Sequence, residues 1–219
     1  MKRDILRQIQ EITAKFVSES MSVAECYPKL SENEILWQGF TNISFVLKNQ
    51  KYEVLYNECL KERAFNFVLL DGAIIQMMYK FDRNNLISHR LAFLPNPNIE
   101  KYQDNPEEYE ERYYGNRLFV DIAENDIVVS PFRFDFDNDT GKFIEYDHPY
   151  SHLTIGNYRN CRIPISSPLS PNRFIQFILI NFYFDKYKDV FSNNDFECSL
   201  KFDNTITNKE RKLLHLNFE

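Results

Sequence analysis

Residues able to act on a phosphate group gather between positions 133 and 162 of the chain. The stretch HPYSHLTIG holds His148 and His152, with Thr154 two residues further on. Two histidines four apart bind a metal when they share one helix face, but the proline after His148 disfavours a helical backbone there. On a strand, His152 and Thr154 instead point to the same side. His148, His152 and Thr154 are therefore the candidate catalytic residues.

A single histidine–hydroxyl unit is half of a phosphodiester-cleaving arrangement, in which one histidine acts as base and another as acid. The sequence does not supply the second unit. Leu91 stands two residues after His89, and Asn217 stands two residues after His215. His89 also alternates with Leu91 and Phe93 on a strand-like run. We therefore expect His89 to be a core histidine.

Alternation in the stretch FRFDFD predicts a strand with one apolar and one charged face. Arg133, Asp135 and Asp137 lie on the charged face. The two carboxylates could hold Mg²⁺ or Mn²⁺, as in enzymes that act on phosphates, although a solvated outer face is the simpler interpretation. Mg²⁺ or Mn²⁺ is expected only if the protein is such an enzyme. Otherwise we expect no cofactor.

Three arginines, Arg133, Arg159 and Arg162, are candidates for binding a ligand. A guanidinium group can donate two parallel hydrogen bonds to a phosphate or carboxylate group. Arg159 and Arg162 could equally pair with the acidic segment 107–111. Cys161, which lies between them, alternates with isoleucines and is predicted to be a core thiol.

Helices are predicted from apolar spacing and from capping residues. Apolar residues at helical spacing predict an amphipathic helix over about the first 20 residues. Ser170 at an N-cap position and Pro171 at the first helical position predict the start of a central apolar helix. Thr207 and Glu210 are spaced as a capping box. A further helix is predicted over residues 51–65, with its buried side formed by Val54, Leu55, Cys59 and Leu60.

Strands are predicted mainly from alternation. The clearest signal is a hairpin over residues 66–94, with a turn at 83–85 where asparagine tolerates positive φ. The acidic, tyrosine-rich segment 95–116 is predicted to be an exposed loop that contains a short helix. The other strand candidates are residues 33–40, 42–48, 117–122, 126–137, 151–156 and 161–166.

Together these elements predict an α+β fold, with a mainly antiparallel sheet and flanking helices. A length of 219 residues, 43% of them hydrophobic, suits a single domain with a sizeable core. Within this domain, residues 1–65 form an N-terminal helical and mixed part. Residues 66–219 form the core that is built on the sheet.

The net charge of −6 means that the chain as a whole does not attract nucleic acid or an anionic membrane. Its 26 lysines and arginines still permit a local basic patch. The N-terminus lacks the apolar core of a signal peptide, and the longest apolar stretch, at 174–184, is too short to cross a bilayer. Four scattered cysteines suit a reducing compartment. We therefore expect a cytoplasmic protein with no membrane partner.

Five segments between about Leu70 and Tyr183 are distinctive when taken in order: LDGAIIQMMYKF, HRLAFLPNP, FRFDFD, HPYSHLTIGNYRNCRIPIS and PLSPNRFIQFILINFY. Together they make the chain resemble a bacterial family of uncharacterised proteins, defined by a domain of unknown function. The resemblance implies a cytoplasmic bacterial or mobile-element protein with a link to defence against phage. It implies no particular reaction.

The expected function is that of a non-catalytic recognition or scaffold component of a bacterial anti-phage defence or toxin-type assembly. Such a component would work with a protein partner or as a homo-oligomer, using the tyrosines of segment 95–116 as interface anchors. The alternative is a phosphoesterase or metal-dependent nuclease in which Asp135, Asp137, His148, His152 and Arg162 converge. A binder of a small nucleotide or a nucleic-acid end, without chemistry, is the third hypothesis.

Overall fold

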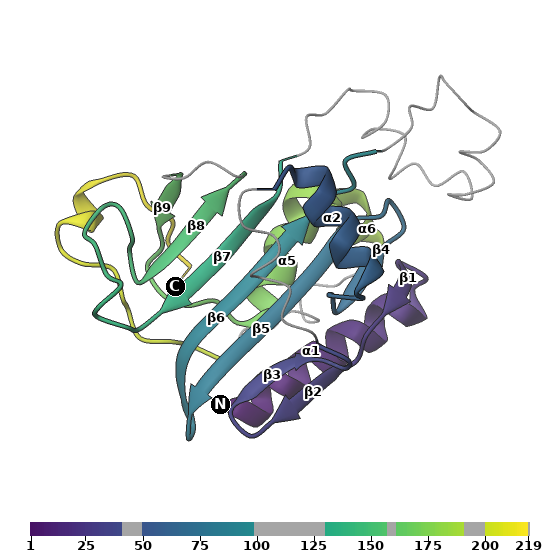
Figure 1. Cartoon of the computed structure of the whole chain (residues 1–219), viewed down its shortest axis with the longest axis horizontal. Helices are drawn as coiled ribbons and strands as arrows, with labels where there is room; N and C mark the ends of the chain where they lie inside the picture. The colour runs from purple at the N-terminus through teal and green to yellow at the C-terminus, as the bar shows by residue number, and fades with distance from the viewer. Residues whose placement is uncertain (41–49, 99–129, 157–160, 191–199, 219) are drawn as a thin grey trace.

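The computed structural model describes residues 1–40, 50–98, 130–156, 161–190 and 200–218. Within these ranges, nine strands form one antiparallel sheet with helices against both faces (Figure 1). The predicted α+β class and the N-terminal helix are confirmed. The sheet order is β1-β4-β5-β6-β7-β8-β9, and β3, paired with β2, also joins β5. The strands are β1 (Ser22–Glu25), β2 (Pro28–Ser31), β3 (Glu34–Trp37), β4 (Phe67–Leu69), β5 (Ile74–Asp82), β6 (Asn85–Leu94), β7 (Phe132–Asp137), β8 (Ser151–Ile155) and β9 (Arg162–Pro164); the helices are α1 (Lys2–Ser18), α2 (Tyr52–Lys61), α5 (Pro171–Phe182) and α6 (Phe184–Val190).

The centre of the sheet is a hairpin formed by β5 and β6. The predicted range of 66–94 began too early, because residues 67–69 form the separate strand β4, which pairs with β5. The register of the hairpin pairs Asp82 with Asn85, so the turn consists of Arg83 and Asn84 alone. The positive φ, 56°, is taken by Arg83 and not by an asparagine as predicted. A two-residue hairpin turn needs positive φ at its first central position, and this register places arginine there.

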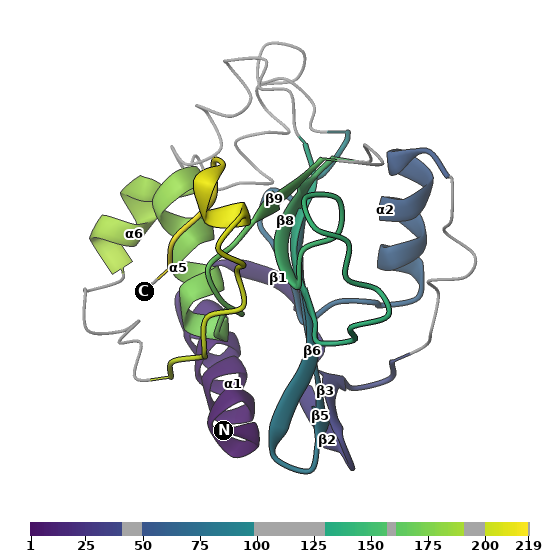
Figure 2. The same ribbon diagram turned by 90° about the vertical axis from the view of Figure 1, so that its left-hand side faces the viewer.

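One face of the sheet is covered by α1, α5 and α6, which Figure 2 shows on the same side. The four residues that predicted the N-terminal helix, Ile5, Ile9, Ile12 and Phe16, are all buried in this main core. Because side chains alternate along a strand, filling this face with apolar groups turns the polar residues of the same strands to the other face. The strands contribute Met77, Leu91, Phe134 and Leu153, and α5 contributes Phe174 and Ile178.

The opposite face carries α2, which Figure 2 shows on the side away from α1 and α5, and Figure 1 shows that this helix covers only part of the sheet. Tyr56 and Cys59 of α2 pack with Val68 and Ile74 in a second, smaller core. The prediction that Val54 is buried is wrong, because its side chain is 43% exposed. Residues two apart on a helix are separated by about 200° around its axis, so Val54 faces away from the sheet when Tyr56 faces it.

Two predicted caps are present in the structure. Helix α5 begins at Pro171, and the hydroxyl of Ser170 accepts a hydrogen bond from the backbone N–H of Arg173 at 3.3 Å. In the capping box, the backbone N–H of Thr207 donates to Glu210 Oε2 (2.9 Å), and that of Glu210 donates to Thr207 Oγ1 (3.2 Å). The box opens a short 3₁₀ turn, Glu210–Lys212.

The hairpin also fixes Leu169, the residue before the N-cap of α5. The backbone N–H of Leu169 donates to His89 Nε2 (3.0 Å), and its carbonyl accepts from the Tyr79 hydroxyl (2.9 Å). His89 is buried, so the prediction of a core histidine is confirmed. Burial lowers the pKa of His89 to about 4, which keeps the ring neutral at physiological pH.

Other predictions are only partly met. Cys161 is partly exposed and not a core thiol, because β9 begins after it, at Arg162. The short strands β1 and β2 carry no clear alternation and were not predicted. The strand candidates 42–48 and 117–122, and most of the acidic segment 95–116, lie outside the described residues. No helix in the described ranges is both long and apolar enough to span a membrane.

Candidate functional site

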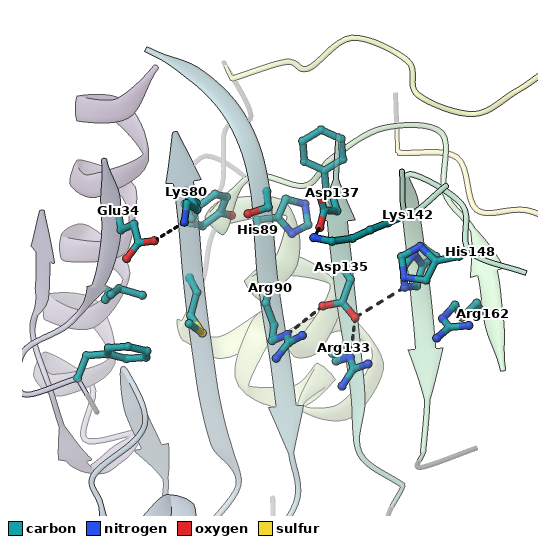
Figure 3. A pocket seen from close by; sticks show the side chains of 17 residues that line it. Glu34, Lys80, His89, Arg90, Arg133, Asp135, Asp137, Lys142, His148 and Arg162 are labelled. Atoms are coloured by element: carbon teal, nitrogen blue, oxygen red, sulfur yellow. Dashed lines mark hydrogen bonds and ion pairs between the residues drawn. The ribbon is translucent and has the colours of Figure 1, made fainter. Parts of the chain in front are cut away.

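The part of the sheet that α2 leaves open carries a charged groove with a cavity volume of about 460 Å³. Its floor comes from β3 and from β5 to β9, and the connection between β7 and β8 supplies one wall (Figure 3). Five cationic side chains face three carboxylates, which leaves an excess of two positive charges. The cations are Lys80, Arg90, Arg133, Lys142 and Arg162, and the carboxylates are Glu34, Asp135 and Asp137.

Strand register places the central charged residues in one row across three strands. Asp135 on β7 pairs with Arg90 on β6 and with His152 on β8. Directly paired residues of adjacent antiparallel strands project to the same face, so these three side chains meet in the groove. The apolar neighbours Leu91, Phe134 and Leu153 project into the main core.

Asp135 holds two arginines in place. Its Oδ1 accepts from Nε of Arg90 at 3.1 Å, and its Oδ2 accepts from Nε of Arg133 at 2.5 Å. Both guanidinium groups contact the carboxylate through Nε. Within the described ranges, the terminal nitrogens of these two arginines make no hydrogen bond. The two arginines are 45% and 42% exposed, whereas the Asp135 side chain is only 14% exposed.

The charge of Asp135 is stabilised by its neighbours. Burial alone would raise the pKa of Asp135, but the charges of Arg133 and Arg90 outweigh burial and hold it at about 2. The carboxylate therefore remains ionised at any physiological pH. A buried anion of this kind positions the guanidinium groups that neutralise it.

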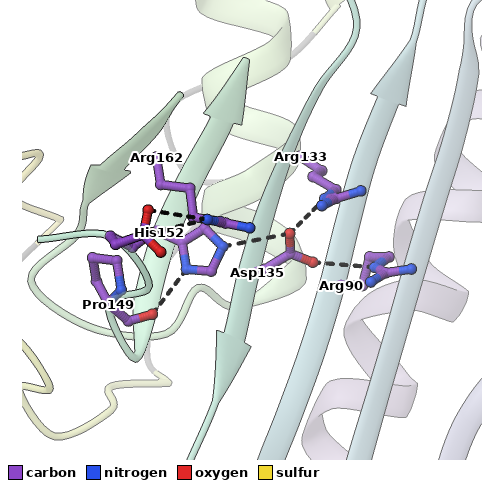
Figure 4. Close-up of polar contacts among 7 residues, drawn as sticks. Arg90, Arg133, Asp135, Pro149, His152 and Arg162 are labelled. Carbon is purple, nitrogen blue, oxygen red and sulfur yellow. Dashed lines mark hydrogen bonds and ion pairs between the residues drawn. The ribbon is translucent and has the colours of Figure 1, made fainter. Parts of the chain in front are cut away.

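His152 is held in one orientation beside this cluster (Figure 4). Its Nδ1 lies 2.9 Å from the carbonyl oxygen of Pro149, an acceptor only, so Nδ1 carries the hydrogen. The other nitrogen, Nε2, lies 3.8 Å from Asp135 Oδ2. Burial lowers the pKa of His152, so the neutral ring presents an unprotonated Nε2. The His148 ring lies at a centroid distance of 5.0 Å from it.

A second row of polar residues lies beside the first. Thr154 on β8 pairs with Arg133 on β7 and with Arg162 on β9. The Thr154 side chain is buried, and its hydroxyl has no hydrogen-bond partner within the described chain. The same holds for Nε of Arg162, although NH1 of that residue donates to the Asp147 carbonyl at 2.9 Å.

Asp137 is engaged differently from Asp135, although both lie on the charged face of β7. Lys142 Nζ lies 2.6 Å from Asp137 Oδ2, and the backbone N–H of Asp139 donates to Oδ1. Each carboxylate of the predicted metal pair is thus already neutralised by basic side chains. In the part of the chain that the structure describes, no three His, Cys, Asp or Glu residues are grouped to hold a metal ion.

Most of the candidate residues from the sequence converge on this groove. Its lining includes Arg133, Asp135, Asp137, His148, His152 and Arg162. Thr154 lies between two lining residues, and Arg159 lies outside the described residues. Sequence reasoning missed Lys80, Arg90 and Lys142. Arg90 alternates with the core residues His89 and Leu91, and that alternation was the available signal.

The comparisons with known proteins identify a family but no activity. A family model described as "uncharacterized conserved protein (DUF2290)" matches residues 18–218. The match extends beyond both ends of the segments that carried the resemblance. No curated protein matches the chain, and no solved structure does.

Proposed function

We propose that this chain, which belongs to the family of uncharacterized conserved proteins DUF2290, is a non-catalytic recognition component that binds a phosphate-bearing ligand. The ligand class is a nucleotide or the end of a nucleic acid. The binding site is the groove on the open face of the sheet, with Arg90, Arg133 and Arg162 as its principal donors.

The observation that carries this proposal is the double ion pair of Asp135. A buried carboxylate holds Arg90 and Arg133 through their Nε atoms, which leaves the terminal nitrogens of both to donate to a ligand. Arginines fixed in this way lose little side-chain entropy when an anion binds. Guanidinium groups suit phosphate because they donate pairs of parallel hydrogen bonds.

Size and charge favour a small or terminal ligand. A volume of about 460 Å³ falls in the range of small-molecule sites. The net charge of −6 opposes extended contact with a nucleic-acid backbone, while the local positive excess in the groove still attracts one phosphate group. Leu36, Phe40 and Met78 line the same groove and offer apolar surface next to the cations.

The wider setting rests on the resemblance described above. It supports a bacterial, cytoplasmic protein that acts in an anti-phage defence or toxin-type assembly. In such an assembly the groove would sense the ligand, and a protein partner or a second copy of the chain would carry the response. Pull-down from the native host, with and without a change in Arg133, would show whether ligand binding and assembly are linked.

The binding proposal is tested with nucleoside 5′-monophosphates and a 5′-phosphorylated thymidine trinucleotide. We expect at least one to raise the melting temperature, since a ligand at 100 times its dissociation constant adds about 2.7 kcal/mol. The substitution Arg133→Gln should remove most of this stabilisation. Arg7→Gln is the matched control, because Arg7 lies on α1 against the other face of the sheet. The absence of stabilisation by every probe would contradict the proposal.

A second candidate function, a phosphoesterase, is favoured by the orientation of His152. Its Nδ1 hydrogen bond to Pro149 leaves Nε2 able to accept a proton, as a general base requires. Hydrolysis of the trinucleotide with Mg²⁺ or Mn²⁺ that is lost in His152→Ala, but kept in the control His215→Ala, would establish it. Binding without hydrolysis in the native protein is the result that we expect.

A further inference from the structure

We propose that Arg133, Thr154 and Arg162 form the binding site for a terminal phosphate group. The ligand would then be a phosphomonoester and not an internal phosphodiester. This inference rests on the proposed function and specifies which chemical group the groove recognises. It assigns a role to Thr154 that differs from that of a general acid or base, since the hydroxyl only donates a hydrogen bond.

The three residues form a row across the last three strands of the sheet. Thr154 pairs directly with Arg133 on one side and Arg162 on the other, so all three side chains leave the same face. Two strand spacings separate the arginine backbones by about 10 Å, which leaves room for one phosphate group between their long side chains. Both arginines line the groove, and the buried Thr154 lies beneath it between them.

Two donors in this row have no partner within the described residues. The hydroxyl of Thr154 is buried on a side chain that is 7% exposed, and Nε of Arg162 is also buried. An unpaired buried donor costs about 1–3 kcal/mol, so such atoms mark a place where a partner is missing. In the proposed complex a phosphate between the two arginines accepts from both atoms, which requires the side chains that cover them to move, because neither atom is exposed to the groove.

The number of donors matches a terminal phosphate. The row offers the terminal nitrogens of Arg133, the Nε edge of Arg162 and the Thr154 hydroxyl. A phosphomonoester has three non-bridging oxygens and a charge between about −1.5 and −2 at neutral pH. An internal diester has only two such oxygens and a single negative charge.

The inference is tested with three thymidine trinucleotides that carry a 5′-phosphate, a 3′-phosphate or no terminal phosphate. Isothermal titration should show at least one phosphorylated form binding about tenfold or more tightly than the unphosphorylated form. Equal affinity of all three would overturn the inference while leaving phosphate recognition intact. If none of the three binds, and the nucleoside monophosphates also fail, the proposed function itself is wrong.

A conservative change at Thr154 separates binding from folding. Thr154→Val removes the hydroxyl and keeps the shape, so we expect an unchanged or higher melting temperature without ligand, because an unsatisfied buried group is lost. Affinity for the preferred phosphorylated trinucleotide should fall about tenfold. Ser22→Ala is the matched control, since the Ser22 hydroxyl is also buried and unpartnered within the described chain but lies on β1.

The two variants together give a clear decision. Loss of affinity for the phosphorylated trinucleotide in Thr154→Val, with full affinity in Ser22→Ala, supports the proposed phosphate-binding site. Full affinity in Thr154→Val overturns it, whatever the melting temperature. Arg162→Lys adds a second measurement, because lysine keeps the charge but lacks Nε, and it should weaken binding of the phosphorylated trinucleotide more than that of the unphosphorylated one.

Discussion

At the scale of single residues, two aspartates in the described part of the chain, Asp135 and Asp71, have opposite environments. Asp135 lies between two arginines, which hold its pKa at about 2 despite burial. Asp71 is 5% exposed and has only neutral partners: its Oδ1 accepts from the N–H of Ala73 (2.9 Å), and its Oδ2 accepts from the Tyr183 hydroxyl (2.6 Å). Burial therefore raises the pKa of Asp71. The first aspartate organises the groove, whereas the second serves only the fold.

The raised pKa of Asp71 has a defined effect on stability. The native state holds this proton more tightly than the unfolded chain, so the contribution of Asp71 is present at low pH and is lost as pH rises through its folded pKa. We expect Asp71→Asn to gain stability relative to the native protein between pH 4 and pH 8, because asparagine stays neutral. Urea unfolding at both pH values measures the difference.

The control for this prediction is Asp71→Ala, which removes both hydrogen bonds. It should destabilise the protein by about 1–3 kcal/mol at low pH, where the native carboxyl is protonated. A difference between the native protein and Asp71→Asn that does not change with pH would show that Asp71 has no raised pKa.

At the scale of elements, the start of α5 connects the helical layer to the sheet. Leu169 is held by His89 and Tyr79 of the central hairpin, and the next residue, Ser170, caps the helix. The buried face of α5 then packs on the phenylalanines of β7, including Phe134. The position of α5 thus keeps the apolar side of β7 inward and its charged side in the groove.

The cap of α5 makes a measurable contribution to the free energy of unfolding. Ser170→Ala removes the acceptor for the backbone N–H of Arg173, and we expect a loss of about 1 kcal/mol in the free energy of unfolding. For a chain of this length, that corresponds to a fall of about 2–4 °C in melting temperature. Ser18→Ala, at the exposed end of α1, should change stability by less than about 0.5 kcal/mol. Equal effects of the two changes would contradict the assigned cap.

Elements with local signals could be predicted from the sequence, and the groove could be predicted only in part. The hairpin, α1 and the Ser170 cap depend on residues close together in the chain, so spacing and capping rules identified them. Arg90 and Asp135 are 45 positions apart, and their contact depends on the register between β6 and β7. Alternation along β6 could place Arg90 on the charged face, but local patterns do not specify the register of strands joined by a long connection, so its pairing with Asp135 could not be predicted.

At the scale of the whole molecule, the two faces of the sheet have different structural roles. The face under α1 and α5 carries the main core. The other face carries α2, which Figure 2 shows on the opposite side from α1, and beside it the groove. A site on the open face of a sheet has a rigid floor, because each floor strand is hydrogen bonded to its neighbours and packed from behind. Its side chains therefore keep their spacing without a ligand.

The carboxylate that holds Arg90 and Arg133 also offsets part of their positive charge. Because Asp135 stays ionised and binds Nε of both arginines, an incoming anion meets only their terminal nitrogens. If the groove binds phosphate as proposed, Asp135 weakens its attraction for every anion. We therefore expect chloride, which has no set of oxygens to accept paired hydrogen bonds, to bind more weakly than a phosphate group.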